Sequence, residues 1–333
     1  MPQACGLSSA IAVAAYLNCI SCGFVFDDRL AITGNPDVLA PGLWDVGMLS
    51  HDFWGKPLRE SDSHKSYRPV TTFSFRLHAW VPERTSQLHP AHFHALNVVL
   101  HALVTACVAQ LAAHAWPNAG RPRASVGLLA GMLFAVHPVH VEAVTGVVGR
   151  AELLCALFCF LATAAYRASV AASLDGTSLP ARRLLAQLML GLAFVVCFCA
   201  AVLSKETGIT LLGILGAHEL AVALPSAGFR RGALGTLGRA VLLGCCAAAY
   251  AAMRLLLMRA DGAAVSFASA SLATSELIRR AENPLAFVRG TVPWLLSVGR
   301  VNCEYANPDP NPNGGPRQLR ACAALALAGR AVR

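Results

Sequence analysis

Seven long apolar runs constrain the fold of this chain more than any other feature of its sequence. They cover residues 7–26, 94–116, 125–136 continuing into 141–149, 150–170, 184–203, 207–224 and 238–258, and a weaker eighth run covers 286–301. A helix needs about 20 predominantly apolar residues to cross the hydrocarbon core of a bilayer. The runs therefore predict an all-α multi-pass membrane protein.

The composition supports this class and gives no sign of a nucleic-acid partner. Apolar residues make up 56% of the 333 residues and charged residues only 14%, whereas roughly a quarter of the residues in a soluble domain are charged. The net charge of +9 reflects in part loop arginines that face anionic lipid headgroups. The sequence has no basic stripe interleaved with aromatic residues, so we expect no nucleic-acid binding.

Arginines between the apolar runs predict the orientation of the chain. They fall in alternate connections and are Arg121, Arg123, Arg167, Arg182, Arg183, Arg230, Arg231 and Arg239. The positive-inside rule predicts that these connections are cytoplasmic, which leaves the turns at 137–142 and 204–207 and the segment 27–93 on the opposite, non-cytoplasmic side. Residues 1–26 lack the basic start of a cleavable signal peptide, so we expect them to form a retained signal anchor.

The segment 27–93 is too polar to enter lipid, yet it contains many aromatic residues. These are Trp44, Phe53, Trp54, Tyr67, Phe73, Phe75 and Trp80. Aromatic rings are enriched at the boundary between lipid and water. We therefore expect an ordered non-cytoplasmic loop that lies on the membrane through short amphipathic helices.

Two adjacent carboxylates, Asp27 and Asp28, follow the first run directly. An acid at a membrane boundary is costly unless it is solvated, paired or functional. In one interpretation Asp27 caps the span and Asp28 pairs with Arg29. In the other, one carboxylate accepts a proton from a hydroxyl nucleophile while its neighbour positions that group.

A second constellation, Ser63 to Pro69, combines His64, Lys65 and Arg68. Arg68 is suited to bidentate phosphate contact, and Lys65 would act as a mobile point charge. Lys205 and Glu206 are expected on the same membrane face. A solvated charge cluster and structural ion pairs are the alternatives to a phosphate site.

The third constellation is His137, His140 and Glu142, followed by Arg150 and Glu152. Pro138 interrupts the helix, so His137, His140 and Glu142 can project into a polar cavity at the same, non-cytoplasmic membrane face. The same proline spoils the helical geometry of a zinc motif, and we expect no bound metal.

Most cysteines are expected to be lipid-buried or packing thiols, because they lie inside apolar runs. They are Cys19, Cys107, Cys155, Cys159, Cys197, Cys199, Cys245 and Cys246. The Cys19-x-x-Cys22 spacing has no second pair to complete a zinc site.

Several short motifs, taken in order, resemble the TMTC family, the transmembrane O-mannosyltransferases with tetratricopeptide repeats. They are Phe24 to Asp28, Asp52 to Gly55, Ser63 to Pro69, His137 to Val144, Gly146 to Leu153, and Lys205-Glu206. Each motif is short, but the ordered set is specific and extends over roughly residues 7–300.

The resemblance implies a GT-C glycosyltransferase fold in the endoplasmic reticulum membrane with a luminal active site. It implies dolichyl phosphate mannose as donor and Ser or Thr hydroxyls of cadherin-type domains as acceptors, with no cofactor. The family's paired acid maps onto Asp27 and Asp28, with Asp28 as general base, Asp27 as its alternative and Glu142 as a third candidate catalytic carboxylate.

The remaining expected roles follow from residue chemistry. Cations would meet the negative charge that grows on the leaving phosphate, and the candidates are Arg68, Lys65, Lys205 and Arg150. Candidates for positioning the sugar or the acceptor are His64, His137, His140 and Glu206.

Two departures from the family pattern shape the expected domain organisation. Thr207 stands where the family usually has Gln, and no 34-residue repeat is visible, so the family's tetratricopeptide array is absent from this sequence. We expect a luminal catalytic loop at 27–93, a multi-span GT-C region at 94–301, and a disordered or atypical tail at 302–333. A truncated noncatalytic fragment, a donor-lipid-binding scaffold and a transporter are the competing interpretations.

Overall fold

The computed structural model describes residues 2–60, 62–80, 88–115, 122–174, 179–223 and 229–259. The described residues contain no β-strand, only an isolated bridge between His51 and Pro57. Their longer helices are α1 (Pro2–Tyr16), α3 (Pro69–Trp80), α4 (Pro90–Ala115), α5 (Arg123–Ala135), α7 (Arg150–Leu174), α8 (Pro180–Ser204), α9 (Thr210–His218) and α11 (Phe229–Arg259).

Short helical segments connect these helices. They are η1 (Leu17–Ser21), η2 (Arg29–Thr33), α2 (Pro36–Leu39), η3 (Val46–Ser50), η4 (Pro138–His140), α6 (Val141–Thr145), η5 (Val147–Gly149), η6 (Glu206–Ile209) and η7 (Glu219–Ala223).

Within the described residues, five helical stretches are long and apolar enough to cross a membrane, which confirms the all-α multi-pass class. They are Pro2–Ser21, Pro90–Ala115, Val147–Ser173, Ala181–Ser204 and Gly235–Leu257. A sixth crossing is possible through α5 and the segment Pro138–Thr145, which meet at a 51° bend. Pro138 lies at this bend, as expected from its missing backbone donor.

The apolar run 207–224 differs from the single helix that its composition suggests. It is divided among η6, α9 and the π-helical segment η7, and it is not among the five stretches above. Gly208 lies so close to α8 that a Cβ there would be 2.9 Å from the carbonyl carbon of Ala201. The expected eighth span at 286–301 and the tail at 302–333 lie outside the described residues.

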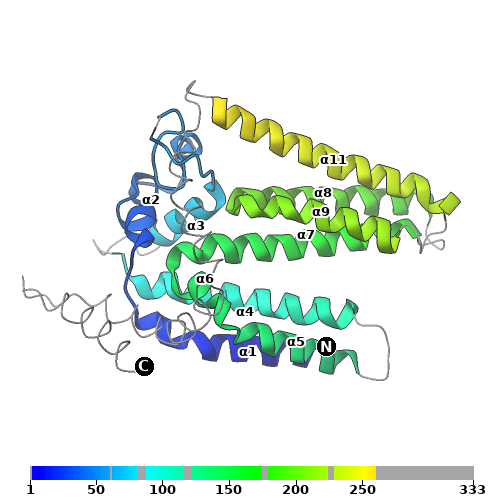
Figure 1. Ribbon diagram of the computed structural model, residues 1–333, viewed down its shortest axis with the longest axis horizontal. Coiled ribbons are helices and arrows are strands. Elements are labelled where there is room, and N and C mark those ends of the chain that lie inside the picture. Colours follow the sequence, from blue (N-terminus) through cyan, green and yellow to red (C-terminus); the bar gives the residue numbers. More distant parts are fainter. Residues whose placement is uncertain are drawn as a thin grey trace, which may run out of the picture.

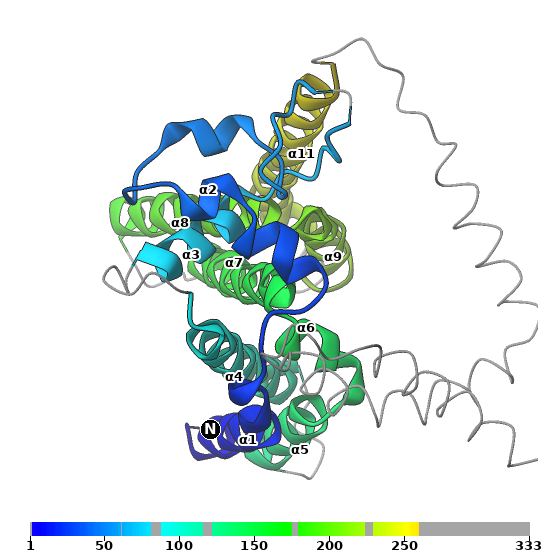
Figure 2. The ribbon, with the colours of Figure 1, turned by 90° about the vertical axis from the view of Figure 1, so that its left-hand side faces the viewer.

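Consecutive long helices run in opposite directions, so the segment between α1 and α4 gathers at one end of the bundle (Figure 1). We call residues 27–60 and 62–80 the cap. The cap packs on the bundle through Ile32, Phe53 and Phe75, which contact Phe93 of α4 and Val147 of η5. Figure 2 shows the cap segments crossing the ends of α7 and α8.

Several apolar clusters hold the described part of the bundle, and α7 contributes to more than one of them. Tyr166 of α7, Phe194 and Phe198 of α8, and Leu215 of α9 form one of them. The outer face of α8 instead exposes more than half of each large apolar side chain, at Leu184, Leu185, Leu188, Met189, Leu192 and Val196. A contiguous apolar face of this kind suits contact with lipid.

Close packing of α1, α4 and α5 depends on glycines four residues apart on α5. A Cβ on Gly127 would lie 2.6 Å from the carbonyl oxygen of Ala109. A Cβ on Gly131 would lie 2.7 Å from the Cβ of Ser8 and 3.0 Å from the Cβ of Ala109. Small residues at such positions let membrane helices approach closely.

We expect Gly131→Leu to destabilise the fold by roughly 1–3 kcal/mol, the usual cost of overpacking, because α1 and α4 would have to move apart. Thermal unfolding in detergent measures the effect. Gly191→Leu on α8 is the matched control, since a Cβ on Gly191 meets nothing within 4 Å. Equal unfolding midpoints for the two variants would contradict this account of the packing.

Candidate active site

Asp28 is the most constrained of the expected catalytic residues. Its side chain is buried, with the residue 1% exposed. One carboxylate oxygen accepts a 2.9 Å hydrogen bond from the backbone amide of Val148, and the other a 3.1 Å bond from that of Val25. Burial raises the pKa of Asp28, and these amides partly offset that effect. Asp28 thus ties the start of the cap to η5.

Asp27 is exposed, in contrast to its neighbour. The preceding Phe26 has a φ of 42° and is 82% exposed. A left-handed conformation in a bulky residue costs about 1–3 kcal/mol and is concentrated at functional sites. Arg29 is also exposed, and Asp28 contacts amides instead of Arg29. The adjacent carboxylates therefore occupy different environments.

Arg150 and Asn97 form a buried support beneath Asp28. Arg150 donates to the Asn97 side-chain oxygen at 3.0 Å, to the Phe93 carbonyl at 3.0 Å and to the Ser74 carbonyl at 3.3 Å. The Asn97 amide nitrogen donates in turn to the Gly146 carbonyl at 3.1 Å. These contacts hold the η5 turn, whose Val148 amide binds Asp28.

Arg150 was expected to bind the donor phosphate. It is 0% exposed, and its guanidinium also lies 4.8 Å from the ring centre of Phe75. We therefore assign it, as a proposal, to positioning η5. Asn97 had no expected role, although a polar residue inside an apolar run is itself a signal of function or structure.

A second group of charges joins the cap to the bundle. Arg68 donates to Glu206 at 3.0 Å and lies over the ring of Phe53 at 4.9 Å. Lys205 pairs with Glu152. We call Arg68, Glu152, Lys205 and Glu206 the ion-pair cluster. Its members come from the cap, α7 and the turn after α8, so the expected meeting of Arg68 with Lys205-Glu206 at one end of the bundle is present.

The formal charges of the ion-pair cluster cancel, because each cation is paired with a carboxylate. Burial, together with neighbouring Arg68, lowers the pKa of Lys205, and Glu206 and Glu142 oppose this shift. One carboxylate oxygen of Glu206 is buried and has no hydrogen-bond partner among the described residues. Glu142 is exposed on α6, and its negative charge raises the pKa of Lys205.

Lys65 and His64 belong to a tight loop around Asp52. The Lys65 ammonium group donates to the carbonyls of Leu58 and Glu60, and its backbone has a φ of 57°. Asp52 is buried and accepts from the Ser63 hydroxyl at 2.7 Å and from the His64 amide at 3.0 Å. The His64 side chain is exposed, so Asp52 orders the segment that carries both candidates.

His137 and His140 lie at the bend that follows α5. The His137 ring nitrogen accepts from the Val139 amide at 3.2 Å and thereby caps η4. His140 packs with its ring centre 4.1 Å from Phe134 and 5.4 Å from the buried ring of His101. Among the described residues, no group of three or more His, Cys, Asp or Glu side chains is placed to hold a metal ion.

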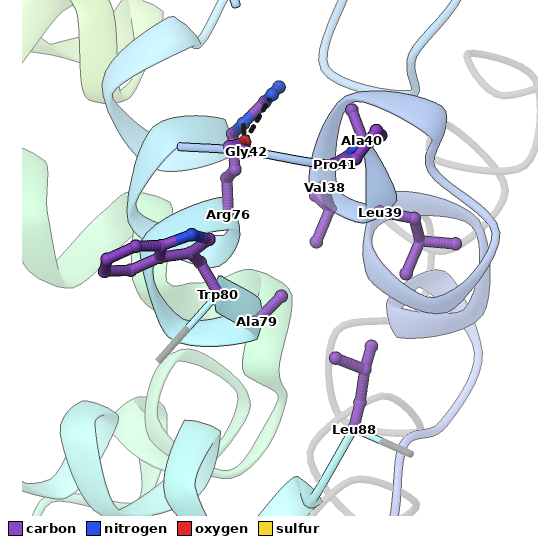
Figure 3. A pocket seen from close by; sticks show the side chains of 9 residues that line it. All are labelled: Val38, Leu39, Ala40, Pro41, Gly42, Arg76, Ala79, Trp80 and Leu88. Carbon is purple, nitrogen blue, oxygen red and sulfur yellow. Dashed lines mark hydrogen bonds between the residues drawn. The ribbon is translucent and has the colours of Figure 1, made fainter. Parts of the chain in front are cut away.

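A pocket of about 310 Å³ lies between α2 and α3 (Figure 3). Its lining is Val38, Leu39, Ala40, Pro41, Gly42, Arg76, Ala79, Trp80 and Leu88. Arg76 donates to the Gly42 carbonyl at 2.8 Å and to the Asp37 carbonyl at 2.8 Å. None of the expected site residues lines this pocket.

Comparison with curated proteins shows that this chain is similar to several proteins named protein O-mannosyl-transferases. It is 38% identical over 229 residues to human "Protein O-mannosyl-transferase TMTC1", covering 66% of this chain and 24% of that protein. The match to human TMTC3 is 39% over 213 residues, 64% of this chain and 21% of the relative. Drosophila melanogaster Tmtc3 is 41% identical over 229 residues, 63% of this chain and 23% of that protein.

The chain therefore spans about a quarter of the length of the curated relatives it matches. No family model matches it. No solved structure matches it either.

Proposed function

Because this chain belongs to the TMTC family by its similarity to these O-mannosyl-transferases, we propose that it transfers mannose from dolichyl phosphate mannose to Ser or Thr hydroxyls. The acceptors would be cadherin-type domains in the endoplasmic reticulum lumen, and the membrane region would be of the GT-C type. The observation that carries the proposal is the exposed Asp27 beside the buried Asp28, at the same end of the bundle as the ion-pair cluster.

In the proposed reaction, the acceptor oxygen attacks the anomeric carbon from the face opposite the phosphate. The new C–O bond forms as the bond from the anomeric carbon to the phosphate oxygen breaks, and the bonding electrons leave with dolichyl phosphate. The anomeric configuration inverts. The acceptor proton passes to a carboxylate, which acts as general base.

We assign the base role to Asp27 and the positioning role to Asp28. Asp27 is exposed and can meet an incoming hydroxyl. Both oxygens of Asp28 already accept amide hydrogen bonds, and the residue is almost fully buried. This reverses the assignment of the base to Asp28 that was made from the sequence, where Asp27 was the alternative.

The ion-pair cluster supplies the proposed site of the departing phosphate. Arg68 and Lys205 are the cations best placed to stabilise the negative charge that develops there. Glu206 and Glu152 hold them in the absence of donor. The ammonium group of Lys65 contacts carbonyls of its own loop. Its positive charge would therefore stabilise the phosphate from a distance, without direct contact.

Mannosyl transfer by the purified chain tests the proposal. Detergent-solubilised protein is incubated with dolichyl phosphate mannose and a purified cadherin domain, and the glycopeptide is identified by mass spectrometry. We expect Ser- or Thr-linked mannose with inverted configuration. Correctly folded protein that transfers no mannose would contradict the proposed function for this chain and favour a noncatalytic membrane protein.

A further inference from the structure

Arg254, near the C-terminal end of α11, forms a hydrogen bond to the cap. Its guanidinium donates to the carbonyl oxygen of Lys65 in the cap at 3.1 Å, across 189 residues of sequence. Figures 1 and 2 both show this end of α11 beside the cap. A cation of the bundle is thus held against the segment that carries Arg68.

Tyr250 lies one helical turn before Arg254 and connects the same face of α11 to the ion-pair cluster. It is close enough to both Arg254 and Glu206 to interact with them electrostatically. Residues four apart on an α-helix lie on one face. Tyr250 therefore links Arg254 to the Glu206 end of the ion-pair cluster.

Arg254 differs from Arg68 and Lys205 in its pairing with carboxylates. Arg68 and Lys205 each pair with a carboxylate, Glu206 and Glu152. Arg254 makes no ion pair within the described part of the chain, and its hydrogen bond to the Lys65 carbonyl uses one of the five N–H donors of a guanidinium. Its remaining donors are available to an anion.

We propose that Arg254 binds the phosphate of the dolichyl phosphate mannose donor together with Arg68 and Lys205. This inference rests on the proposed function. The paired charges of the cluster compensate one another, whereas phosphate gains negative charge as the sugar departs. An uncompensated arginine stabilises that added charge, and its planar fork can contact two phosphate oxygens at once.

The test measures equilibrium binding of radiolabelled dolichyl phosphate to detergent-solubilised protein. We expect Arg254→Gln to bind at least about tenfold more weakly than wild type, as loss of a charge-assisted hydrogen bond requires. Arg254→Lys, which keeps the charge but loses the fork, should fall between them. Arg182→Gln removes an exposed arginine from the N-terminal turn of α8 and should bind like wild type.

Thermal unfolding of each variant separates binding from folding. Wild-type affinity in folded Arg254→Gln would overturn the role of Arg254 and leave the proposed function standing. Failure of folded wild type to bind dolichyl phosphate would overturn the donor assignment itself. If Arg254→Gln does not fold, Arg254→Lys decides: unchanged affinity in that variant contradicts phosphate contact through the fork. Equal competition by phosphatidic acid would assign the site to phospholipid headgroups and overturn donor binding.

Discussion

Asp27→Asn should lower the rate of mannosyl transfer by roughly 10²–10⁴-fold, the usual contribution of a general base. Asparagine keeps the shape of the side chain but cannot accept the hydroxyl proton. Since Asp27 is exposed, the unfolding midpoint should not change. The measurement is kcat for transfer to a purified cadherin domain, with donor and acceptor saturating.

Asp28→Asn tests the positioning role assigned to the buried carboxylate. Its amide group would point a donor at either the Val25 or the Val148 amide, each of which now donates to a carboxylate oxygen. We expect a loss of stability of about 1–3 kcal/mol, the cost of an unsatisfied buried group. Asp62→Asn, at an exposed carboxylate of the cap that pairs with Lys56, controls for removal of a negative charge.

The two aspartate variants can also contradict the assigned roles. If Asp27→Asn retains nearly full activity while Asp28→Asn folds normally and loses it, then Asp28 is the base. Equal losses of activity in both variants at unchanged stability would contradict the division between a reacting and a positioning carboxylate.

Asp28 should also leave a signature in the pH dependence of stability. Its pKa is raised by burial, so the folded state keeps a proton at pH values where the unfolded state has lost it. The stabilisation from this group is therefore largest at low pH and falls as pH rises from the ordinary carboxyl pKa through the raised value. The difference in unfolding midpoint between wild type and Asp28→Asn should shrink over that interval.

The helical class and most of the spans could be predicted from sequence because long apolar runs specify them directly. Pro138 also marked the bend after α5, since a proline removes a helical hydrogen bond. The division of 207–224 could not be predicted in the same way. It depends on the contact of Gly208 with α8 and on the pairing of Glu219 with Arg239, which are tertiary features.

The sequence could predict which candidate residues lie at the same end of the helices, but not their individual contacts. Alternating helices bring Arg68 and Glu206 to one end, and the order of the runs is sufficient to show this. Which carboxylate is buried depends on the docking of η5 against Asp28, 120 residues away. The sequence therefore could not separate the roles of Asp27 and Asp28, nor reveal Arg254 beside Lys65.

Arg150→Met should destabilise the protein by at least about 3 kcal/mol, the equivalent of two hydrogen bonds from a charged group. Methionine fills a similar volume but leaves the Asn97 side-chain oxygen and the Phe93 and Ser74 carbonyls without their donor. Removing a buried charge also removes its desolvation cost, yet the buried side-chain oxygen of Asn97 would be left without its donor. Thermal or chemical unfolding in detergent gives the value.

Arg29→Met is the matched control, because it makes the same substitution at an exposed arginine of the cap. It should leave the unfolding midpoint unchanged. The comparison also decides between the two roles considered for Arg150. A folded Arg150→Met of normal stability that no longer binds dolichyl phosphate would restore Arg150 as a phosphate ligand. A less stable variant that binds donor normally below its unfolding midpoint would establish that Arg150 supports η5, and through it Asp28.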